Sequence, residues 1–209
     1  MTRSQVNDAI KEMPARTHAV LVYDSAENKR DVLYNHLKMG VDTDGLVYVC
    51  SEESPRMARE ELQGSGMDVE SLESKGLLSV KNYDEVYIVD GEVNSPRIIK
   101  DFSNLAWKYS REGLKGIRAS AEMSCFFKAK KVEELVSYEN ALHRTFSFPG
   151  RGLCGYNLLE MENTGSLESL WPILRAHQLV IMTGPNGSFA LEPEAISKSD
   201  VESTMKIEL

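Results

Sequence analysis

The side chains best able to do chemistry follow the expected strands of an α/β sheet, at the points where those strands end. In an open parallel sheet, ligands bind outside the carboxyl ends of the strands. Phenol, hydroxyl, amide and carboxylate groups gathered there would form the polar part of a small-molecule pocket. The sequence therefore predicts a ligand site at this edge, the rim, with no catalytic and no metal-binding residue. Its expected lining is Tyr23, Asp24, Ser51, Glu52, Glu122, Met123, Tyr156 and Asn157.

Glu122 has the widest chemical range of these residues. It follows a run of small residues, Ala119 to Ala121, which lets neighbouring elements approach closely. A carboxylate there could accept hydrogen bonds from a ligand, act as a base or hold a metal-bound water. The alternative is a structural carboxylate at the start of the next helix, where the helix dipole favours negative charge. The sequence leaves both interpretations open.

Three further polar residues could support this site. Glu139 lies on an apolar helical stripe with Leu135 and Leu142, so its carboxylate must be paired or have its pKa raised by desolvation. Arg118 could be its partner, and an internal structural ion pair is favoured over a functional role. His18 opens the first strand, where a hydrogen-bonding role is favoured over metal binding.

The histidines and cysteines show no metal-binding spacing. No C-x-x-C or H-E-x-x-H occurs, and the cysteine count is odd, so neither a zinc site nor a disulfide framework is predicted. Cys50 and Cys154 fall in expected buried strands as small apolar residues. Cys125 is the thiol expected nearest the rim, and it lacks an adjacent base. No cofactor is expected.

Short β-rich runs alternate with amphipathic stretches along the chain. This alternation predicts an α/β fold with a mostly parallel central sheet and helices on both faces. A small hairpin or edge strand is expected between residues 83 and 93. The strands are expected at 19–23, 46–50, 77–80, 116–121, 152–157 and 179–182.

The turn after the first strand, residues 24–28, contains no glycine. A phosphate-binding loop would place G-x-x-x-x-G-K-[ST] here, and Asp24 and Glu27 would repel a phosphate. Lys29 and Arg30 are the only basic groups nearby that could replace the missing lysine. The turn therefore favours sensing over nucleotide chemistry.

Composition limits the partners. The net charge of −8 and the absence of a basic block argue against direct nucleic-acid binding. No apolar run is long enough to span a bilayer, and residues 1–16 lack the apolar core of a secretory signal. A cytoplasmic protein with reduced thiols, not bound to a membrane, is expected.

The chain is expected to divide into an N-terminal helical extension (1–16), an α/β domain (17–191) and a polar, partly disordered tail (192–209). Within the extension, Val6, Ile10 and Met13 fall on one side of a short helix. That side could pack on the domain's own surface or contact a second subunit, and the sequence does not decide between the two.

Several segments match a known family in order and spacing. They are His18-Ala-Val-Leu-Val-Tyr23-Asp24, Val-Tyr-Val-Cys-Ser51-Glu52-Glu53, Gly116-Ile-Arg118-Ala-Ser-Ala-Glu122-Met123, Tyr138-Glu139, Leu153-Cys154-Gly155-Tyr156-Asn157 and Leu174-Arg175-Ala176-His177. Over about residues 18–190 the chain resembles the MEDS domain, the methanogen/methylotroph DcmR sensory domain. The resemblance implies a RecA/KaiC-like three-layer sandwich that lacks the phosphate loop.

Such domains are prokaryotic signalling modules, often fused to DNA-binding or kinase domains that regulate transcription. The resemblance thus implies a sensor of small molecules, such as one-carbon or halogenated compounds. Together with the strand-end site, it leads us to expect a non-catalytic cytoplasmic sensor that binds its ligand at the rim. We expect a homodimer that relays binding to a regulator or kinase by non-covalent contact. Two alternatives remain: a divergent nucleotide-binding enzyme related to KaiC, and an oligomeric adaptor that has lost nucleotide binding.

Overall fold

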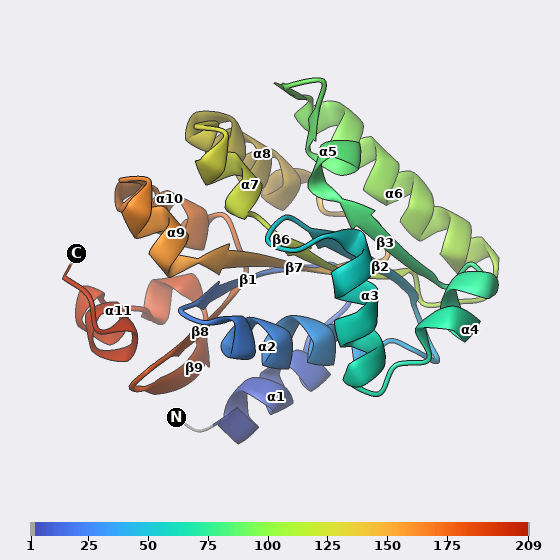
Figure 1. The fold of residues 1–209 in the computed structure, drawn as a ribbon, viewed down its shortest axis with the longest axis horizontal. Helices are drawn as coiled ribbons and strands as arrows, with labels where there is room; N and C mark the ends of the chain where they lie inside the picture. Colours follow the sequence, from blue (N-terminus) through green and yellow to red (C-terminus); the bar gives the residue numbers. More distant parts are fainter. Residues whose placement is uncertain (1–2, 209) are drawn as a thin grey trace.

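A seven-stranded sheet forms the centre of the protein, for which a computed structural model describes residues 3–208. The strand order is β3-β2-β6-β7-β1-β8-β9, and neighbouring strands are parallel except β8 and β9 (Figure 1). The six predicted strands are all present. The bounds are β1 Thr17–Tyr23, β2 Gly45–Cys50, β3 Leu78–Asn82, β6 Ile117–Glu122, β7 Gly150–Asn157, β8 Leu179–Gly184 and β9 Gly187–Leu191.

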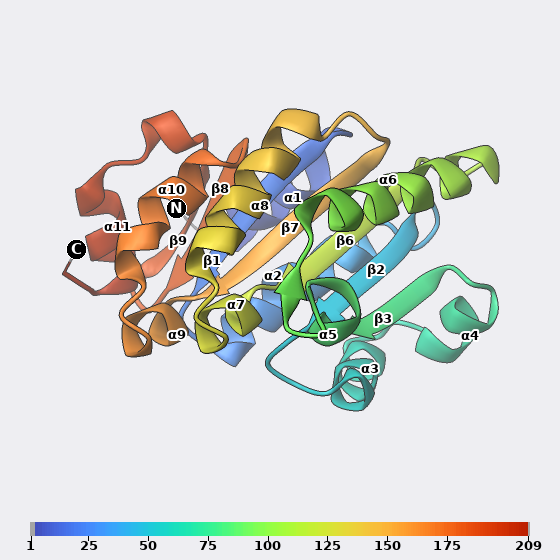
Figure 2. The same cartoon turned by 90° about the horizontal axis from the view of Figure 1, so that it is seen from above.

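Helices cover both faces of this sheet, which confirms the three-layer α/β fold; the arrangement is consistent with a RecA-like one. The α2 face carries α1 (Arg3–Glu12), α2 (Ala26–Lys38), α3 (Pro55–Gly64) and α4 (Val69–Ser74). The α8 face carries α6 (Ser95–Arg111), α7 (Ser124–Lys128), α8 (Val132–Thr145), α9 (Leu158–Asn163) and α10 (Leu170–Arg175). Figure 2 shows α6 and α8 crossing above β6 and β7.

Side-chain alternation along the strands decides which layer each residue joins. In β1, Leu21 and Tyr23 pack in the hydrophobic core of the α2 face, whereas Val20 and Val22 pack in that of the α8 face. Two separate cores result, one on each side of the sheet. Polar residues in the strands are divided between the faces in the same way.

Helix starts follow local signals in the sequence. The Ser25 hydroxyl accepts a hydrogen bond from the Asn28 amide at the beginning of α2. Ser54 caps α3 with Pro55 in its first turn, as the Ser-Pro pair predicts. These caps satisfy amide groups that the helix itself leaves unpaired.

The N-terminal helix packs on the chain itself. Val6, Ile10 and Met13 are buried in the core of the α2 face, and α1 contacts α2 and β9. Of the two interpretations of this apolar side, the structure thus shows internal packing.

The C-terminal segment differs from its expected partial disorder. It contains a 3-10 turn at Pro193–Ala195 and the helix α11 (Lys198–Met205), which begins with a capping box between Ser197 and Asp200. Val201 and Met205 of α11 are buried in the core of the α8 face. Val201 and Met205, four residues apart on one side of α11, together with Ile196 and Ile207, dock a segment whose composition is otherwise polar.

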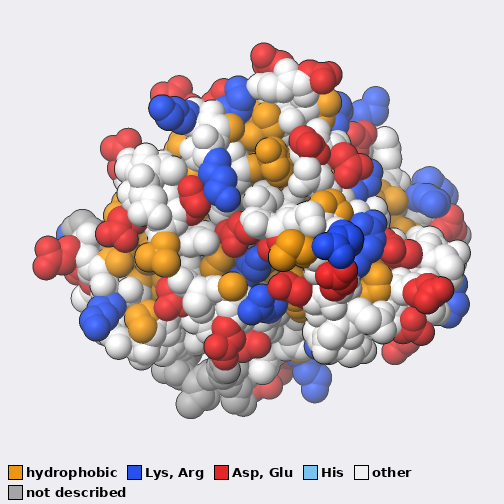
Figure 3. Space-filling view, viewed as in Figure 1, with side chains coloured by type: hydrophobic (Ala, Val, Ile, Leu, Met, Phe, Trp, Pro, Cys, Tyr) orange, Lys and Arg blue, Asp and Glu red, His pale blue; other side chains and the backbone are white. Residues whose placement is uncertain are grey.

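Smaller elements complete the description. The segment after β3 forms α5 (Tyr83–Val86) and then the expected hairpin of β4 (Ile88–Val89) and β5 (Glu92–Val93). Acidic and basic side chains are interspersed over the face of the molecule in Figure 3. None of the helices within residues 3–208 is long and apolar enough to cross a membrane.

Candidate functional site

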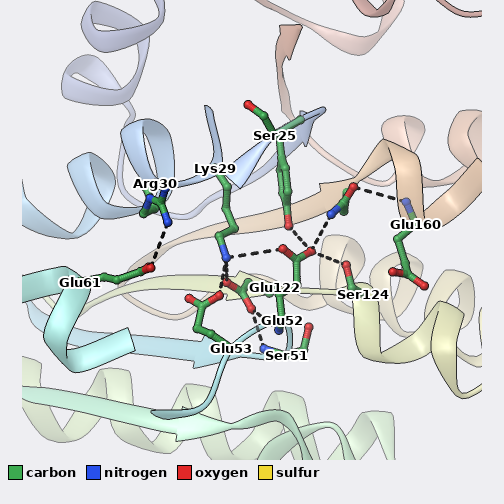
Figure 4. Close-up of polar contacts among 12 residues, drawn as sticks. Ser25, Lys29, Arg30, Ser51, Glu52, Glu53, Glu61, Glu122, Ser124 and Glu160 are labelled. Carbon is green, nitrogen blue, oxygen red and sulfur yellow. Dashed lines mark hydrogen bonds and ion pairs between the residues drawn. The ribbon is translucent and has the colours of Figure 1, made fainter. Parts of the chain in front are cut away.

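The structure gathers five of the eight predicted rim residues around one lysine on the α2 face. They are Tyr23, Ser51, Glu52, Glu122 and Asn157, which follow or end β1, β2, β6 and β7. The lysine is Lys29, in the first turns of α2. We call these residues, together with Tyr48, Glu53 and Ser124, the Lys29 cluster. Figure 4 labels six of its members: Lys29, Ser51, Glu52, Glu53, Glu122 and Ser124.

Lys29 lies under the turn that follows β1 and contacts three carboxylates. Its Nζ is 2.6 Å from Glu122 Oε1, 2.5 Å from Glu53 Oε2 and 3.5 Å from Glu52 Oε2. Its side chain is only 3% exposed. Burial opposes the charge, but Glu122 and Glu53 outweigh it and hold the pKa of Lys29 above its ordinary value.

Glu122 is fully buried and fully hydrogen bonded. Besides Lys29, Oε1 accepts a bond of 2.6 Å from the Tyr48 hydroxyl. Oε2 accepts the backbone amides of Ser51 at 2.6 Å and Glu52 at 2.7 Å. The carboxylate therefore ties the ends of β2 and β6 together, which is a structural role.

Glu52 is held in a similar way. Its Oε1 accepts the Ser124 hydroxyl at 2.6 Å, the Tyr23 hydroxyl at 2.6 Å and the Asn157 side-chain amide at 3.2 Å. Burial raises the pKa of this carboxyl, but these hydrogen bonds and the charge of Lys29 bring it below its ordinary value. Glu52 is thus a carboxylate that links β1, α7 and β7.

Glu53 is the carboxyl group of the cluster whose pKa is raised. Burial and the nearby Glu122 charge, opposed by Lys29, raise its pKa from 4.5 to about 7. One cation facing three carboxylates favours proton uptake by one of them. A phosphate entering here would meet this excess of negative charge, so the cluster is electrostatically unsuited to a nucleotide.

Three predicted rim residues lie elsewhere. Asp24 accepts a hydrogen bond of 2.6 Å from the side-chain amide of Asn28, within its own turn. Met123 is buried in the core of the α8 face. Tyr156 also lies in that core and donates a hydrogen bond to Glu139, because successive residues of β7 point to opposite faces. Only its neighbour Asn157 reaches Glu52.

The predicted pairing of Glu139 with Arg118 is wrong. Arg118 points to the α2 face, where its Nε lies 3.4 Å from Asp44 Oδ2. Glu139 lies on the other side of the sheet, in α8. The alternation of β6, with Ile117 and Ala119 on the α8 face, explains why Arg118 cannot reach it.

Glu139 instead joins a second polar cluster, the histidine cluster of His18, Glu139, Cys154, Tyr156 and His177. Oε2 of Glu139 is 3.1 Å from His18 Nε2 and 3.6 Å from His177 Nε2. Cys154 Sγ is 3.5 Å from the same Nε2 of His18. All five residues are no more than 5% exposed.

The protonation of this cluster follows from its burial. Burial and the neighbouring His18, opposed by Glu139, lower the pKa of His177 to about 3. His177 Nδ1 lies 2.7 Å from the Ile173 carbonyl oxygen, so the proton of the neutral ring resides on Nδ1 and Nε2 carries a lone pair. Burial and Glu139 raise the pKa of the Cys154 thiol well above its ordinary value.

Comparison with known families identifies the family to which this chain belongs. Residues 17–178 match the family model of the MEDS domain, described as MEthanogen/methylotroph, DcmR Sensory domain. The chain belongs to the MEDS family. Both polar clusters lie within the matched residues of this MEDS domain.

Solved structures resemble the MEDS fold at low sequence identity. One, from a structural study of a Pyrococcus horikoshii OT3 protein, has a TM-score of 0.58 and 10% identity, with 95% of each chain covered. This likeness shows the fold alone. No curated protein matches the chain.

A small apolar cavity adjoins the histidine cluster of this MEDS domain. It measures about 30 Å³ and lies between β1, β6, β7 and the helices α6 and α8. His18 and Cys154 belong to both the cluster and the cavity wall. The remaining lining is mainly aromatic and aliphatic: Tyr87, Phe102, Ile117, Ala119, Ala121, Tyr138, Leu142, Phe146, Phe148, Arg151, Gly152 and Leu153.

Little in the sequence signals the histidine cluster. Its members come from β1, α8, β7 and the segment that follows α10, so no local spacing marks them. The available signal was that Glu139 and His177 each fall on an otherwise apolar helical stripe. When polar residues occur on the apolar sides of two separate segments, both are expected to be buried and to share a partner, because burial of an unpaired polar group is costly.

Proposed function

We propose that this protein is a non-catalytic sensory domain that binds a small, uncharged and largely apolar molecule in the cavity beside His18 and Cys154. The family match supports a sensory role. The observation that carries the location of the site is the apolar cavity under α6 and α8. The rim, where the sequence predicted the ligand, is instead occupied by side chains that bond to one another.

The size of the cavity restricts the ligand. A cavity of about 10–15 Å³ holds one water molecule, and about 150 Å³ accommodates benzene. The cavity of about 30 Å³ therefore suits a molecule of very few heavy atoms. One-carbon compounds, including halogenated ones, fit this range.

The lining supports an apolar ligand with at most one polar contact. Its aromatic rings and alanines offer dispersion contacts. Among the described residues, Nδ1 of His18 is buried without a hydrogen-bond partner, and it is the polar atom best placed for a hydroxyl or a halogen. A charged ligand would have no counter-ion in this wall beyond Arg151, which contacts Asp44.

Phe102 offers a route of entry. It lines the inner cavity and also a surface groove of about 260 Å³ between α6 and the β2–β3 edge. A rotation of this half-buried ring would join the two spaces. Because Phe102 belongs to α6, ligand entry and the position of α6 would be coupled, which provides the relay to a regulator or kinase bound outside.

The proposal also covers the cellular location of the protein and the way it reaches its effector. The three cysteines are free and buried, which supports a reducing, cytoplasmic location. The effector would be reached by non-covalent contact, either directly or through a homodimer.

Thermal unfolding with added one-carbon compounds tests the proposal. Saturating dichloromethane or methanol should raise the Tm of the wild-type chain, since a ligand that binds only the native state stabilises it. Ala121→Val, which fills the cavity wall, should abolish that rise. Ala58→Val, at a buried alanine on the α2 face, is the matched control and should keep it.

Equal responses of the two variants, or no response of the wild-type chain to any such compound, would overturn the cavity proposal. A rise in Tm with ATP would instead support the nucleotide-binding alternative.

A further inference from the structure

We propose that the histidine cluster binds a tetrahedral divalent metal ion, Zn²⁺ in the first place, through His18, Glu139, Cys154 and His177. One ligand atom from each residue lies within 4.8 Å of the others, and all four residues are buried. Two imidazoles, a thiolate and a carboxylate form a ligand set that suits zinc.

Three of the six separations between the ligand atoms are close to those in a tetrahedral site, and all six are within 4.8 Å. Zinc bonds of about 2.0–2.3 Å at tetrahedral angles place neighbouring ligand atoms about 3.3–3.7 Å apart. The corresponding contacts are 3.1 Å for His18 Nε2 to Glu139 Oε2, 3.6 Å for His177 Nε2 to Glu139 Oε2 and 3.5 Å for Cys154 Sγ to His18 Nε2. An ion among them would draw the more widely separated atoms, which lie within 4.8 Å of one another, closer together.

An unpartnered lone pair independently points to a cation. The ring of His177 donates through Nδ1 to the Ile173 carbonyl, so its Nε2 faces Glu139 Oε2 as acceptor toward acceptor. Within residues 3–208, this Nε2 has no hydrogen-bond partner, and His177 is only 2% exposed. A metal ion would satisfy both acceptors at once.

The outer contacts resemble those that orient metal ligands elsewhere. A ligating histidine usually donates its other ring N–H to a carbonyl or carboxylate, which fixes the tautomer. The Nδ1 of His177 does this with Ile173. The second oxygen of Glu139 accepts the Tyr156 hydroxyl, which leaves Oε2 for the ion.

The same geometry argues against a nucleophilic cysteine. In an activated Cys–His–carboxylate set, the thiol and the carboxylate contact opposite nitrogens of the ring. Here Cys154 and Glu139 both contact Nε2 of His18. Four groups that converge on one point form a coordination shell, not a relay.

Metal titration of the untagged full-length chain tests the site. After removal of metal with a chelator, the wild-type chain should take up one equivalent of Zn²⁺ in competition with a chromophoric chelator. With Co²⁺, it should show the intense visible bands of a tetrahedral ion and a near-ultraviolet thiolate charge-transfer band. These measurements include no organic ligand, so their outcome is independent of the proposed sensing function.

Matched variants separate the cluster from other buried cysteines and histidines. Cys154→Ser should remove the charge-transfer band, and His177→Gln should weaken Zn²⁺ binding by about 100-fold or more. Cys50→Ser and His36→Gln alter buried residues outside the cluster and should bind like the wild-type chain.

No zinc uptake by the wild-type chain would overturn the proposal, as would a pale octahedral Co²⁺ spectrum. Wild-type affinity in Cys154→Ser together with an unchanged spectrum would exclude the thiolate and overturn the assigned ligand set. If a variant fails to fold by circular dichroism, the Co²⁺ spectrum of the wild-type chain still decides.

Discussion

Lys29 and Glu122 form a buried ion pair in which Nζ and Oε1 are 2.6 Å apart and the side chains are 3% and 0% exposed. Lys29 follows the turn between β1 and α2, and Glu122 ends β6. The ion pair therefore joins the start of a helix to the end of a strand that is distant in the sequence.

Removal of this lysine should be strongly destabilising. Lys29→Met leaves the carboxylates of Glu52, Glu53 and Glu122 without their cation, and breaking a buried pair from one side costs about 3–5 kcal/mol. Urea unfolding at pH 8 should show a loss of this size. The double variant Lys29→Met/Glu122→Gln should recover part of it, because one buried charge is removed.

The adjacent Arg30 is the control for that measurement. Its guanidinium pairs with Glu61 at 3.0 Å, but the Arg30 side chain is 41% exposed. Arg30→Met should therefore cost less than about 1 kcal/mol. Equal losses for the two variants would contradict a buried, structural role for Lys29.

The raised pKa of Glu53 should make stability depend on pH. Because its pKa rises from 4.5 in the unfolded chain to about 7 in the native protein, the native state retains a proton that the unfolded state releases. This contribution is fully present below pH 4.5 and is lost as the pH rises through about 7, on the order of 3 kcal/mol. Glu53→Gln, which stays neutral, should remove this loss.

Urea unfolding between pH 5 and pH 8 checks that prediction. The free energy of unfolding of Glu53→Gln should rise relative to wild type as the pH increases. Glu60→Gln, whose side chain is 60% exposed in a surface pair with Arg56, should follow the wild-type profile. Parallel profiles for wild type and Glu53→Gln would show that Glu53 is ionised across this range.

The hydroxyl of Tyr156 should contribute to the stability of the fold. It donates to the buried carboxylate of Glu139, and an unsatisfied buried acceptor costs about 1–3 kcal/mol. Tyr156→Phe should lower the free energy of unfolding by this amount. Tyr109→Phe removes a hydroxyl that donates to the neutral Gly76 carbonyl, and its smaller expected loss provides the comparison.

The C-terminal helix should contribute to stability. Met205 of α11 is 3% exposed in the core of the α8 face, and truncation of a buried methionine to alanine costs about 2–5 kcal/mol. Met205→Ala should therefore lower the midpoint of urea unfolding, whereas the exposed Ser203→Ala should not. An unchanged midpoint for Met205→Ala would mean that α11 is undocked in solution.

The fold was accessible from the sequence because its signals are local. Continuous apolar runs marked β1, β2 and β8, and the Ser54-Pro55 pair marked the start of α3. The turn expected at residues 24–28 is shorter than predicted, because Ser25 caps α2 and the helix begins at Ala26. The strand β9 was missed, since it is a short edge strand that follows the tight turn between Gly184 and Gly187.

The sites were only partly accessible because they depend on which face each residue meets. The positions of the strand ends correctly placed Tyr23 near Glu52 and Glu122. They also placed Tyr156 there, which is wrong because the side chain of Tyr156 in β7 points to the opposite face of the sheet. Glu139 was correctly expected to be buried and paired. Its partner His177 lies in the connection between α10 and β8, more than thirty residues away, and tertiary packing alone brings the two together.

An NMR titration tests most directly whether the ligand binds in the cavity under α6 and α8 or at the rim, where a nucleotide would bind. Backbone amide spectra of the full-length chain would be recorded with dichloromethane and, separately, with Mg²⁺ and ATP. We predict saturable shifts at cavity residues such as Ala121, Leu142 and Cys154 with dichloromethane, and none with ATP. Shifts at residues 24–30 with ATP, and an unchanged spectrum with dichloromethane, would contradict this account.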